Sequence, residues 1–388
     1  MFPARTMKAF LSFLRREFVF CAAAVCALAS AFFVPPSRAY LSYIDWDTLH
    51  ILFALMGVIG ALRSCGVFDA LARALCGKVR SVRALSAVLV LLCFFSSMLI
   101  TNDVALLTFV PFSLALLGGC AGGKTVLFTV VLETLAANTG SMLTPLGNPQ
   151  NLFLFSKMNL GISEFMRLIA PYSFASLALL CAALCLVPRS RIKGMQGAAA
   201  QKRSAGTMLR EAVYSVLFVL CLLSVVRIVP KWVSALAVLV VLLALDQKVL
   251  RSVDCMLLLT FTAFFIFTGN IASIPAVRGI LQEAMGGNEF ALSVAASQVI
   301  SNVPATLLLF PFAADTESLL IGVNTGGLGT LVASLASLIS FKLYASAQKR
   351  LSLPSNARYL AVFTAANALV LAAMCALRMA IISAFCNT

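Results

Sequence analysis

Long apolar stretches separated by short polar ones extend along almost the whole chain. A helix of about 20 apolar residues crosses a hydrocarbon core about 30 Å thick. Because runs of this kind follow one another, the pattern predicts an all-α polytopic membrane protein. The segments expected to span the bilayer are residues 18–35, 49–64, 125–156, 168–187, 211–229, 232–246, 252–270, 317–343 and 357–380.

Two further apolar segments, residues 84–117 and 289–313, are interrupted near their middle by polar residues. The first carries Thr-Asn-Asp at 101–103, and the second carries Ser-Asn-Val-Pro at 301–304. A polar side chain inside a membrane is costly, so such a break needs partners. We therefore expect each segment to be a helical hairpin that folds back at its polar residues and returns to the side from which it entered.

The two polar interruptions are copies of one another. Five pairs of residues match without a gap at a spacing of 200 positions, namely Asn102/Asn302, Ala105/Ala305, Leu107/Leu307, Pro111/Pro311 and Phe112/Phe312. A second match, at a spacing of 186 positions, relates Asn-Thr-Gly at 138–140 and Thr144 to Asn-Thr-Gly at 324–326 and Thr330. Matching helix-breaking signals in two halves of a membrane protein indicate the binding site of a secondary transporter.

A basic segment, residues 188–210, divides the chain into two halves, 1–187 and 211–388. This segment contains no acidic residue, which favours a flexible linker on the cytoplasmic side. Counting spans from a cytoplasmic N-terminus, the first hairpin enters from the cytoplasm and the second enters from outside. The two halves are therefore expected to form an inverted repeat.

Each half also contains a long helical segment that cannot remain regular. In segment 125–156, residues 144–151 include two prolines and a glycine, which interrupt the hydrogen bonds of a helix. Segment 317–343 is broken by the glycines within 326–329. Irregular backbone at membrane depth is tolerated where it lines a cavity, and there its carbonyls and helix N-termini suit ions. The candidate substrate ligands are Asn102, Thr144, Asn148, Asn151, Asn302, Asn324, Thr325 and Thr330.

Two carboxylates are expected deep within apolar segments, Asp103 and Glu133. An acid inside the membrane indicates a proton carrier or a cation ligand. No lysine or arginine is expected at the site, so helix N-termini, amides and the coupling cation would balance the charge of an anion. The candidate coupling residues are Thr101, Asp103, Glu133, Asn138 and Ser301. The coupling ion is a proton or a sodium ion, and the sodium ligands would be Thr101, Asn102, Ser301 and Asn302.

The composition agrees with a membrane protein, since 61% of the residues are hydrophobic and 11% are charged. The net charge of +15 comes from basic residues that fall mostly in the segments assigned to the cytoplasm, so it indicates orientation and not a nucleic-acid partner. An amphipathic pattern at 67–83 predicts a helix in the membrane interface. The run at 18–34 is interpreted as a span, with a signal peptide as the alternative. Motifs of metalloproteases, serine hydrolases and P-loop enzymes are missing, which argues against an enzyme, and no cofactor is expected.

At residues 101–103, 144–151 and 301–304 the chain resembles the ion transporter superfamily. This group includes divalent-anion:sodium symporters, citrate–metal symporters, arsenite permeases and NhaD-type sodium/proton antiporters. The Asn-Asp pair and the Asn-Val-Pro element are similar to the arsenite-permease branch, and residues 144–151 are similar to the Gly-Thr-Pro-Pro-Asn element of the anion symporters. The resemblance implies a homodimer with an elevator-type transport domain built from the hairpins and the broken helices.

These observations predict a secondary active transporter in the bacterial cytoplasmic (inner) membrane, with its N-terminus inside. The expected substrate is a small anion, either an organic dicarboxylate or citrate-like acid or an inorganic oxyanion such as arsenite, coupled to protons or sodium. A sodium/proton antiporter without an anion is the alternative function. A channel or a purely structural membrane protein forms a third class, which gradient-driven accumulation of a solute would exclude.

Overall fold

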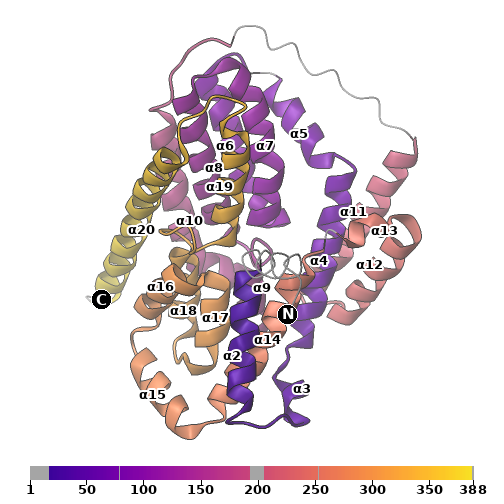
Figure 1. The fold of residues 1–388 in the computed structure, drawn as a ribbon, viewed down its shortest axis with the longest axis vertical. Coiled ribbons are helices and arrows are strands. Elements are labelled where there is room, and N and C mark those ends of the chain that lie inside the picture. Colours follow the sequence, from indigo (N-terminus) through magenta and orange to yellow (C-terminus); the bar gives the residue numbers. More distant parts are fainter. Residues whose placement is uncertain (1–16, 78, 193–204, 252, 387–388) are drawn as a thin grey trace, which may run out of the picture.

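A computed structural model describes residues 17–77, 79–192, 205–251 and 253–386. Within these ranges the regular elements are helices (Figure 1), apart from one antiparallel β-bridge between Ser81 and Arg191. Seven of the described helices are long and apolar enough to cross a membrane. The predicted all-α architecture is therefore confirmed for the described part of the chain, and its helices fit a polytopic membrane protein.

The helices follow one another with mostly short connections. In chain order they are α2 (Phe18–Ala31), α3 (Ala39–Tyr43), α4 (Trp46–Ser64), α5 (Val67–Cys76), α6 (Val82–Ile100), α7 (Asn102–Cys120), α8 (Gly123–Ser141), α9 (Pro149–Lys157), α10 (Ile162–Leu184), α11 (Ala205–Val225), α12 (Lys231–Leu245), α13 (Gln247–Leu250), α14 (Cys255–Ala272), α15 (Pro275–Met285), α16 (Glu289–Ile300), α17 (Asn302–Leu309), the 3₁₀ turn η1 (Phe310–Phe312), α18 (Thr316–Gly326), α19 (Leu335–Gln348) and α20 (Asn356–Cys386).

Two pairs of helices are each joined through a single residue. Thr101 stands between α6 and α7, and Ser301 stands between α16 and α17. Both residues have almost the same backbone conformation, with φ 68° and ψ 150° at Thr101 and φ 74° and ψ 153° at Ser301. This conformation ends one helix and starts the next without a loop. The polar residues at 101–103 and 301–304 therefore lie at the tips of the two helix pairs.

Two other helices are interrupted, each by a short irregular loop. Residues 142–148 separate α8 from α9, and residues 327–334 separate α18 from α19. In the first break Pro149 occupies the first turn of α9, where a missing N–H costs nothing. In the second break Gly329 has φ 108°, which favours glycine. Proline and glycine thus produce the same kind of interruption in the two halves.

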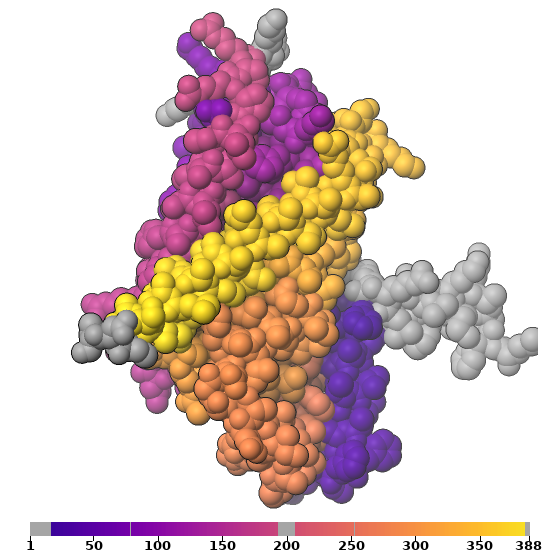
Figure 2. Space-filling model, turned by 90° about the vertical axis from the view of Figure 1, so that its left-hand side faces the viewer, coloured from indigo at the N-terminus to yellow at the C-terminus, as the bar shows by residue number. Residues whose placement is uncertain are grey.

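The hairpins of the two halves, each with the first part of its broken helix, occupy different parts of the molecule. Helices α6, α7 and α8 lie in the upper part of Figure 1, and α16, α17 and α18 lie in the lower part. Helix α19 is an exception, because it follows α18 in sequence but packs against α7 and α8. The yellow helix α20 runs diagonally across both parts in Figure 2 and contacts α8, α10 and α18. Helices α4, α11 and α12 pack together at the right of Figure 1.

Glycines allow the closest helix contacts in both halves. A methyl group at Gly140 in α8 would overlap the carbonyl oxygen of Phe94 in α6. In the second half a methyl group at Gly326 in α18 would lie 2.6 Å from the hydroxyl of Ser297 in α16. Because Gly140 and Gly326 are the glycines of the repeated Asn-Thr-Gly element, the repeat fixes how closely each broken helix approaches its hairpin.

Several predicted boundaries differ from the structure. The amphipathic helix expected at 67–83 ends at Cys76, because Gly77 follows it and residues 80–82 turn to pair with residues 190–192. The first residues of the predicted linker pair with the segment before α6, since the Val82 N–H donates to Ser190 O and the Ile192 N–H donates to Arg80 O. Residues 193–204 of that linker lie outside the described part of the chain. Helix α10 begins at Ile162, six residues before the expected span, because Glu164 accepts a hydrogen bond from the Gly161 N–H.

The glycine contact in the first half gives a testable prediction. We expect Gly140→Ala to lower the unfolding midpoint in detergent, with a cost of about 2 kcal/mol, because an added methyl group must push α8 away from α6. Gly119→Ala is the matched control, since Gly119 in α7 has no atom within 4 Å of an added methyl group. Thermal unfolding of both purified variants checks this. An unchanged midpoint in Gly140→Ala would show that the two helices do not need this close approach.

Candidate functional site

The loop of each broken helix is tied to the hairpin of the same half by a pair of equivalent hydrogen bonds. The Thr144 hydroxyl donates to Met98 O, and the Thr330 hydroxyl donates to Gln298 O over 3.0 Å. The residues of these two bonds match at the same spacings, 186 and 200 positions, as the repeated motifs. The sequence repeat is therefore also a repeat of contacts.

A backbone hydrogen bond repeats in the same way at the hairpin tips. The Asn102 N–H donates to Gly147 O over 3.0 Å, and the Asn302 N–H donates to Ala333 O over 2.9 Å. The first N–H groups of a helix have no partner within that helix, so the neighbouring loop supplies one here. Each hairpin tip is thus held against the interrupted helix of its own half.

The two halves also exchange hydrogen bonds with each other. Asn138 in α8 donates to the Ser337 hydroxyl over 3.1 Å and accepts from the Ser334 hydroxyl over 3.0 Å. Ser334 and Ser337 lie at the start of α19, in the second half.

The counterpart of Asn138 makes the reverse connection. Asn324 in α18 donates to Asn151 Oδ1 over 2.7 Å, and its own Oδ1 accepts from the Asn148 amide over 3.3 Å. Asn148 and Asn151 correspond to Ser334 and Ser337 at the spacing of 186 positions. Each half thus bonds through equivalent residues to the other, as in an interface with two-fold symmetry.

The residues that join the hairpins are held in a strained conformation. Positive φ combined with ψ near 150° is a region that glycine occupies almost alone, and it costs a residue with a side chain about 1–3 kcal/mol. Thr101 and Ser301 both adopt it. Such strain persists where the surrounding structure enforces it, and it gathers at functional sites. Here the enforcing contacts are the two backbone hydrogen bonds to the loops.

A cavity of about 650 Å³ reaches the tip of the first hairpin. Of the predicted site residues, Thr101, Asp103 and Asn148 line it. Asp103 is half-buried in the first turn of α7, and its backbone N–H donates to Asn102 Oδ1 over 3.0 Å. The cavity therefore joins the first hairpin tip and the first helix break.

The other side of this cavity carries charged residues that sequence reasoning missed. Arg63 at the end of α4, Lys248 in α13, and the carboxylates Asp246 and Asp254 all line it. The expectation that no lysine or arginine lies at the site was wrong. The reason is that Arg63 lies at the end of the predicted span 49–64 and Lys248 lies between the predicted spans 232–246 and 252–270, and only the fold brings them to the hairpin tip. Arg63 also donates to Leu107 O in α7 over 2.9 Å.

The remaining asparagines of the site lie behind the cavity wall. Asn102 and Asn302 are each 5% exposed, and the Asn102 amide donates to Asn138 Oδ1 over 3.1 Å. Asn151 is fully buried, and its amide donates to Met142 O over 2.9 Å and to Thr144 O over 3.1 Å. These side chains satisfy the loop carbonyls and position the groups that do face the cavity.

In the second half, the predicted site residues lie in or beside the second helix break, where Gln298 makes most of the hydrogen bonds. Thr325 is buried in α18, and the Ser301 hydroxyl donates to Ala333 O over 3.3 Å. Thr330 is exposed in the second break, where the side chain of Gln298 accepts from its N–H over 2.9 Å. Gln298 also donates to Gly326 O and Leu328 O, each over 2.8 Å. Sequence reasoning missed Gln298 because its partner in the repeat, Met98, is apolar.

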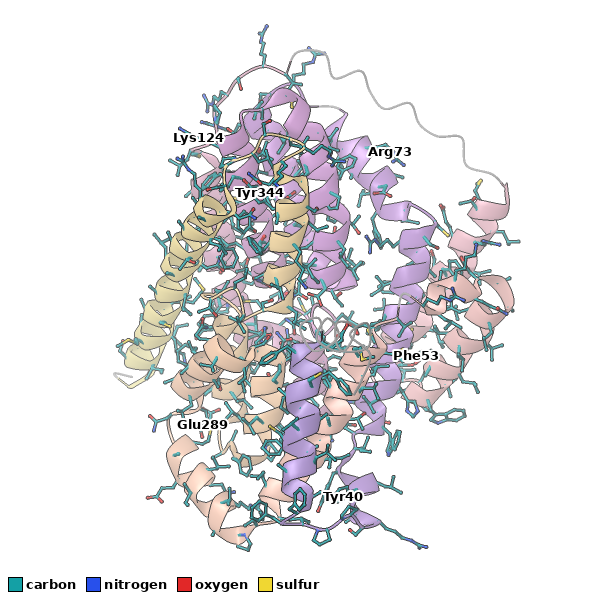
Figure 3. The ribbon with its side chains drawn as sticks, in the orientation of Figure 1. Tyr40, Phe53, Arg73, Lys124, Glu289 and Tyr344 are labelled. Atoms are coloured by element: carbon teal, nitrogen blue, oxygen red, sulfur yellow. The ribbon has the colours of Figure 1, made fainter. Side chains whose placement is uncertain are left out.

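The second predicted acid, Glu133, lies apart from the cavity. It is fully buried in α8, where Ser113 in α7 donates to its Oε1, and no described residue bonds to its Oε2. A third acid, Glu289, is also buried, with its Oε1 accepting from the Asp315 N–H over 3.3 Å. Figure 3 shows Glu289 in the lower part of the molecule, beside α15 and α16. The sequence pattern missed its burial because it stands at the beginning of an apolar run.

Comparisons with known proteins find a transporter family and several membrane proteins similar to this chain. A family model described as "Citrate transporter" matches residues 6–339. Inner membrane protein YbiR of Escherichia coli (strain K12) is 32% identical over 342 residues, which cover 86% of this chain and 90% of that protein. Uncharacterized transporter MJ0456 of Methanocaldococcus jannaschii is 30% identical over 303 residues, which cover 77% of this chain and 81% of that protein. Silicon efflux transporter LSI3 of Oryza sativa subsp. japonica is 34% identical over 143 residues, which cover 36% of this chain and 28% of that protein.

The buried asparagine network gives a second testable prediction. We expect Asn151→Leu to lower the unfolding midpoint in detergent, with a cost of about 1–3 kcal/mol, because the carbonyls of Met142 and Thr144 lose a buried donor. Asn159→Leu, at an exposed position just after α9, is the control with the same chemical change. Equal midpoints for the two variants would mean that the network does not hold the loop in place.

Proposed function

Because the chain belongs to the citrate transporter family, we propose that it is a secondary active transporter that moves a small anion across the membrane, coupled to protons or sodium. The family match over residues 6–339 and the relative named as a transporter indicate a membrane transporter. The resemblance to the ion transporter superfamily is thereby confirmed. The substrate, the coupling ion and the transport mechanism are the parts that we propose.

The observation that carries the proposal is the cavity at the first hairpin tip. It brings Thr101, Asp103 and Asn148 together with the cations Arg63 and Lys248 and the carboxylates Asp246 and Asp254. Arg63 and Lys248 are the groups in this wall that can pair with the charge of an anion. Thr101 and Asp103 supply a hydroxyl and a carboxylate to this cavity, which are the kinds of oxygen that hold a coupling cation.

The proposed substrate class is a small organic dicarboxylate or citrate-like acid, or an inorganic oxyanion such as arsenite. The family description names citrate, and one partial relative is named for silicon efflux. A cavity of about 650 Å³ has room for either class of solute. Asp103 is the proposed site of the coupling ion, because it is the only one of the predicted acids that lines the cavity.

We further propose that the two halves form an inverted repeat and that the transport domain moves as an elevator. The exchange of hydrogen bonds between Asn138 and α19, and between Asn324 and α9, supports a two-fold relation. The hairpins α6–α7 and α16–α17 lie toward opposite ends of the molecule in Figure 1. The same proposal includes division of the chain at 188–210, a homodimer, and a cytoplasmic N-terminus in a bacterial inner membrane.

A sodium/proton antiporter without an anion is the second candidate. The carboxylates Asp103, Asp246 and Asp254 favour it, because all three line the same cavity and acids in such sites bind cations. Proteoliposomes separate the two functions. Sodium-driven change of internal pH with no anion present would support the antiporter, whereas accumulation of citrate, succinate, sulfate or arsenite down an imposed proton or sodium gradient would support the anion transporter.

The role of Asp103 is tested by Asp103→Asn. We expect gradient-driven uptake of the transported solute to fall to the rate of liposomes without protein, because an amide neither carries a proton nor balances a sodium ion. Glu283→Gln, at an exposed position on α15, is the control and should transport normally. Thermal unfolding in detergent shows that both variants fold. Uptake by a folded Asp103→Asn protein at the normal rate and with the normal dependence on pH would remove Asp103 from the mechanism.

The contribution of the cavity cations to anion uptake is tested by Lys248→Gln. We expect the KM for anion uptake at low salt to rise by about threefold, the size of one exposed charge interaction, and the difference to shrink at high salt. Arg350→Gln, an exposed change of equal charge after α19, serves as the control. A KM that does not change at any salt concentration would argue against attraction of an anion by Lys248.

A further inference from the structure

A second cavity lies outside the site described above, at the beginning of α6. Its volume is about 820 Å³, and four arginines contribute to its wall. We call it the arginine groove. Its lining residues are Arg80, Ser81, Arg83, Ala84, Ala87, Arg189, Arg191 and Ile192.

Hydrogen bonds between distant segments build the arginine groove. Residues 80–82 pair with residues 190–192 through Val82 N–H to Ser190 O over 2.9 Å and Ile192 N–H to Arg80 O over 3.1 Å. Arg83 donates to Val187 O and to Cys185 O, each over 2.6 Å, and so caps the end of α10. Backbone pairing between the two segments therefore brings Arg80 and Arg191 close to each other.

The arginine groove concentrates positive charge with no matching carboxylate. Arg80, Arg189 and Arg191 are exposed, and no acidic residue lines the groove. Among the described residues, Asp45, Asp47 and Asp246 form ion pairs with Lys157, Lys231 and Arg210, which lie outside the groove. Three guanidinium groups at one place repel each other, and an anion with several oxygens relieves this repulsion through paired hydrogen bonds.

An apolar path leads from the arginine groove along α6. Ala84 and Ala87 form part of the groove, and Leu91 and Phe95 follow at helical spacing on the same face. The Phe95 side chain is 52% exposed, so this face is open to the surroundings of the molecule. A charged end joined to an exposed apolar face matches a lipid, which has a phosphate headgroup and acyl chains.

We propose that the arginine groove binds the headgroup of an anionic phospholipid. The phosphate oxygens contact Arg80, Arg189 and Arg191, while an acyl chain lies along Ala87, Leu91 and Phe95. Basic pockets between membrane helices bind lipids with two phosphates, because two phosphates engage several guanidinium groups together. The site is independent of the transport cavity, since the two cavities share no lining residue.

The test uses the full-length protein in detergent, with cardiolipin, phosphatidylglycerol, phosphatidylcholine and pyrophosphate as probes. Native mass spectrometry counts bound lipid, and thermal unfolding measures the stabilisation by each probe. We expect cardiolipin to bind most tightly and phosphatidylcholine least. The triple change Arg80→Gln, Arg189→Gln and Arg191→Gln should weaken cardiolipin binding roughly 100-fold, since three charge contacts are lost.

Two controls keep the result unambiguous. The triple change Arg278→Gln, Arg350→Gln and Arg358→Gln removes the same charge at exposed positions elsewhere and should leave cardiolipin binding unchanged. Ala87→Trp fills the apolar path, so it should weaken cardiolipin binding and spare pyrophosphate binding. Equal cardiolipin binding by the two triple variants would overturn the proposal. Pyrophosphate binding as tight as cardiolipin binding would assign the groove to a soluble phosphate and also overturn it.

Discussion

Polar groups inside an apolar protein must bond to one another, and here they do so across the two halves of the chain. Each broken helix leaves backbone carbonyls and N–H groups without helical partners. Asn138 and Asn324 satisfy part of this demand by reaching into the other half, to α19 and to α9 respectively. The two halves therefore cannot separate without leaving buried polar groups unpaired, which is costly. This exchange holds the two loops that interrupt the broken helices.

The same exchange explains why the site has two kinds of polar residue. Asn151, Asn138 and Asn324 are buried and bonded to protein groups, so their role is to shape the loops. Thr101, Asp103 and Asn148 face the cavity and are available to a solute or an ion. The second half has Ser301, Val303 and Ser334 at the equivalent positions, and none of these lines the cavity. The two halves are alike in backbone and contacts but differ in the chemistry of their exposed groups.

Basic residues lie outside this asparagine network, in three different settings. The cations Arg63 and Lys248 line the cavity at the first hairpin tip, together with the carboxylates Asp246 and Asp254. The arginine groove lies at the start of α6, where it faces the surroundings of the molecule. Arg227 follows α11 and donates to Phe155 O and Met158 O at the end of α9, each over 2.9 Å. Position within the fold, and not the net charge of the chain, decides what each arginine does.

The sequence by itself determined the helices, both hairpin tips and both helix breaks. Apolar runs set the helices, and prolines, glycines and the repeated asparagines marked the interruptions, because these signals act through local backbone geometry. It also placed Asp103 at the tip of the first hairpin, within the candidate site. Only the tertiary structure decided that Arg63, Lys248 and Asp254 join that site, that Glu133 stands apart, and that residues 190–192 pair with 80–82. Those contacts join segments far apart in the chain, and spacing along one segment carries no information about which distant helix end will lie beside it.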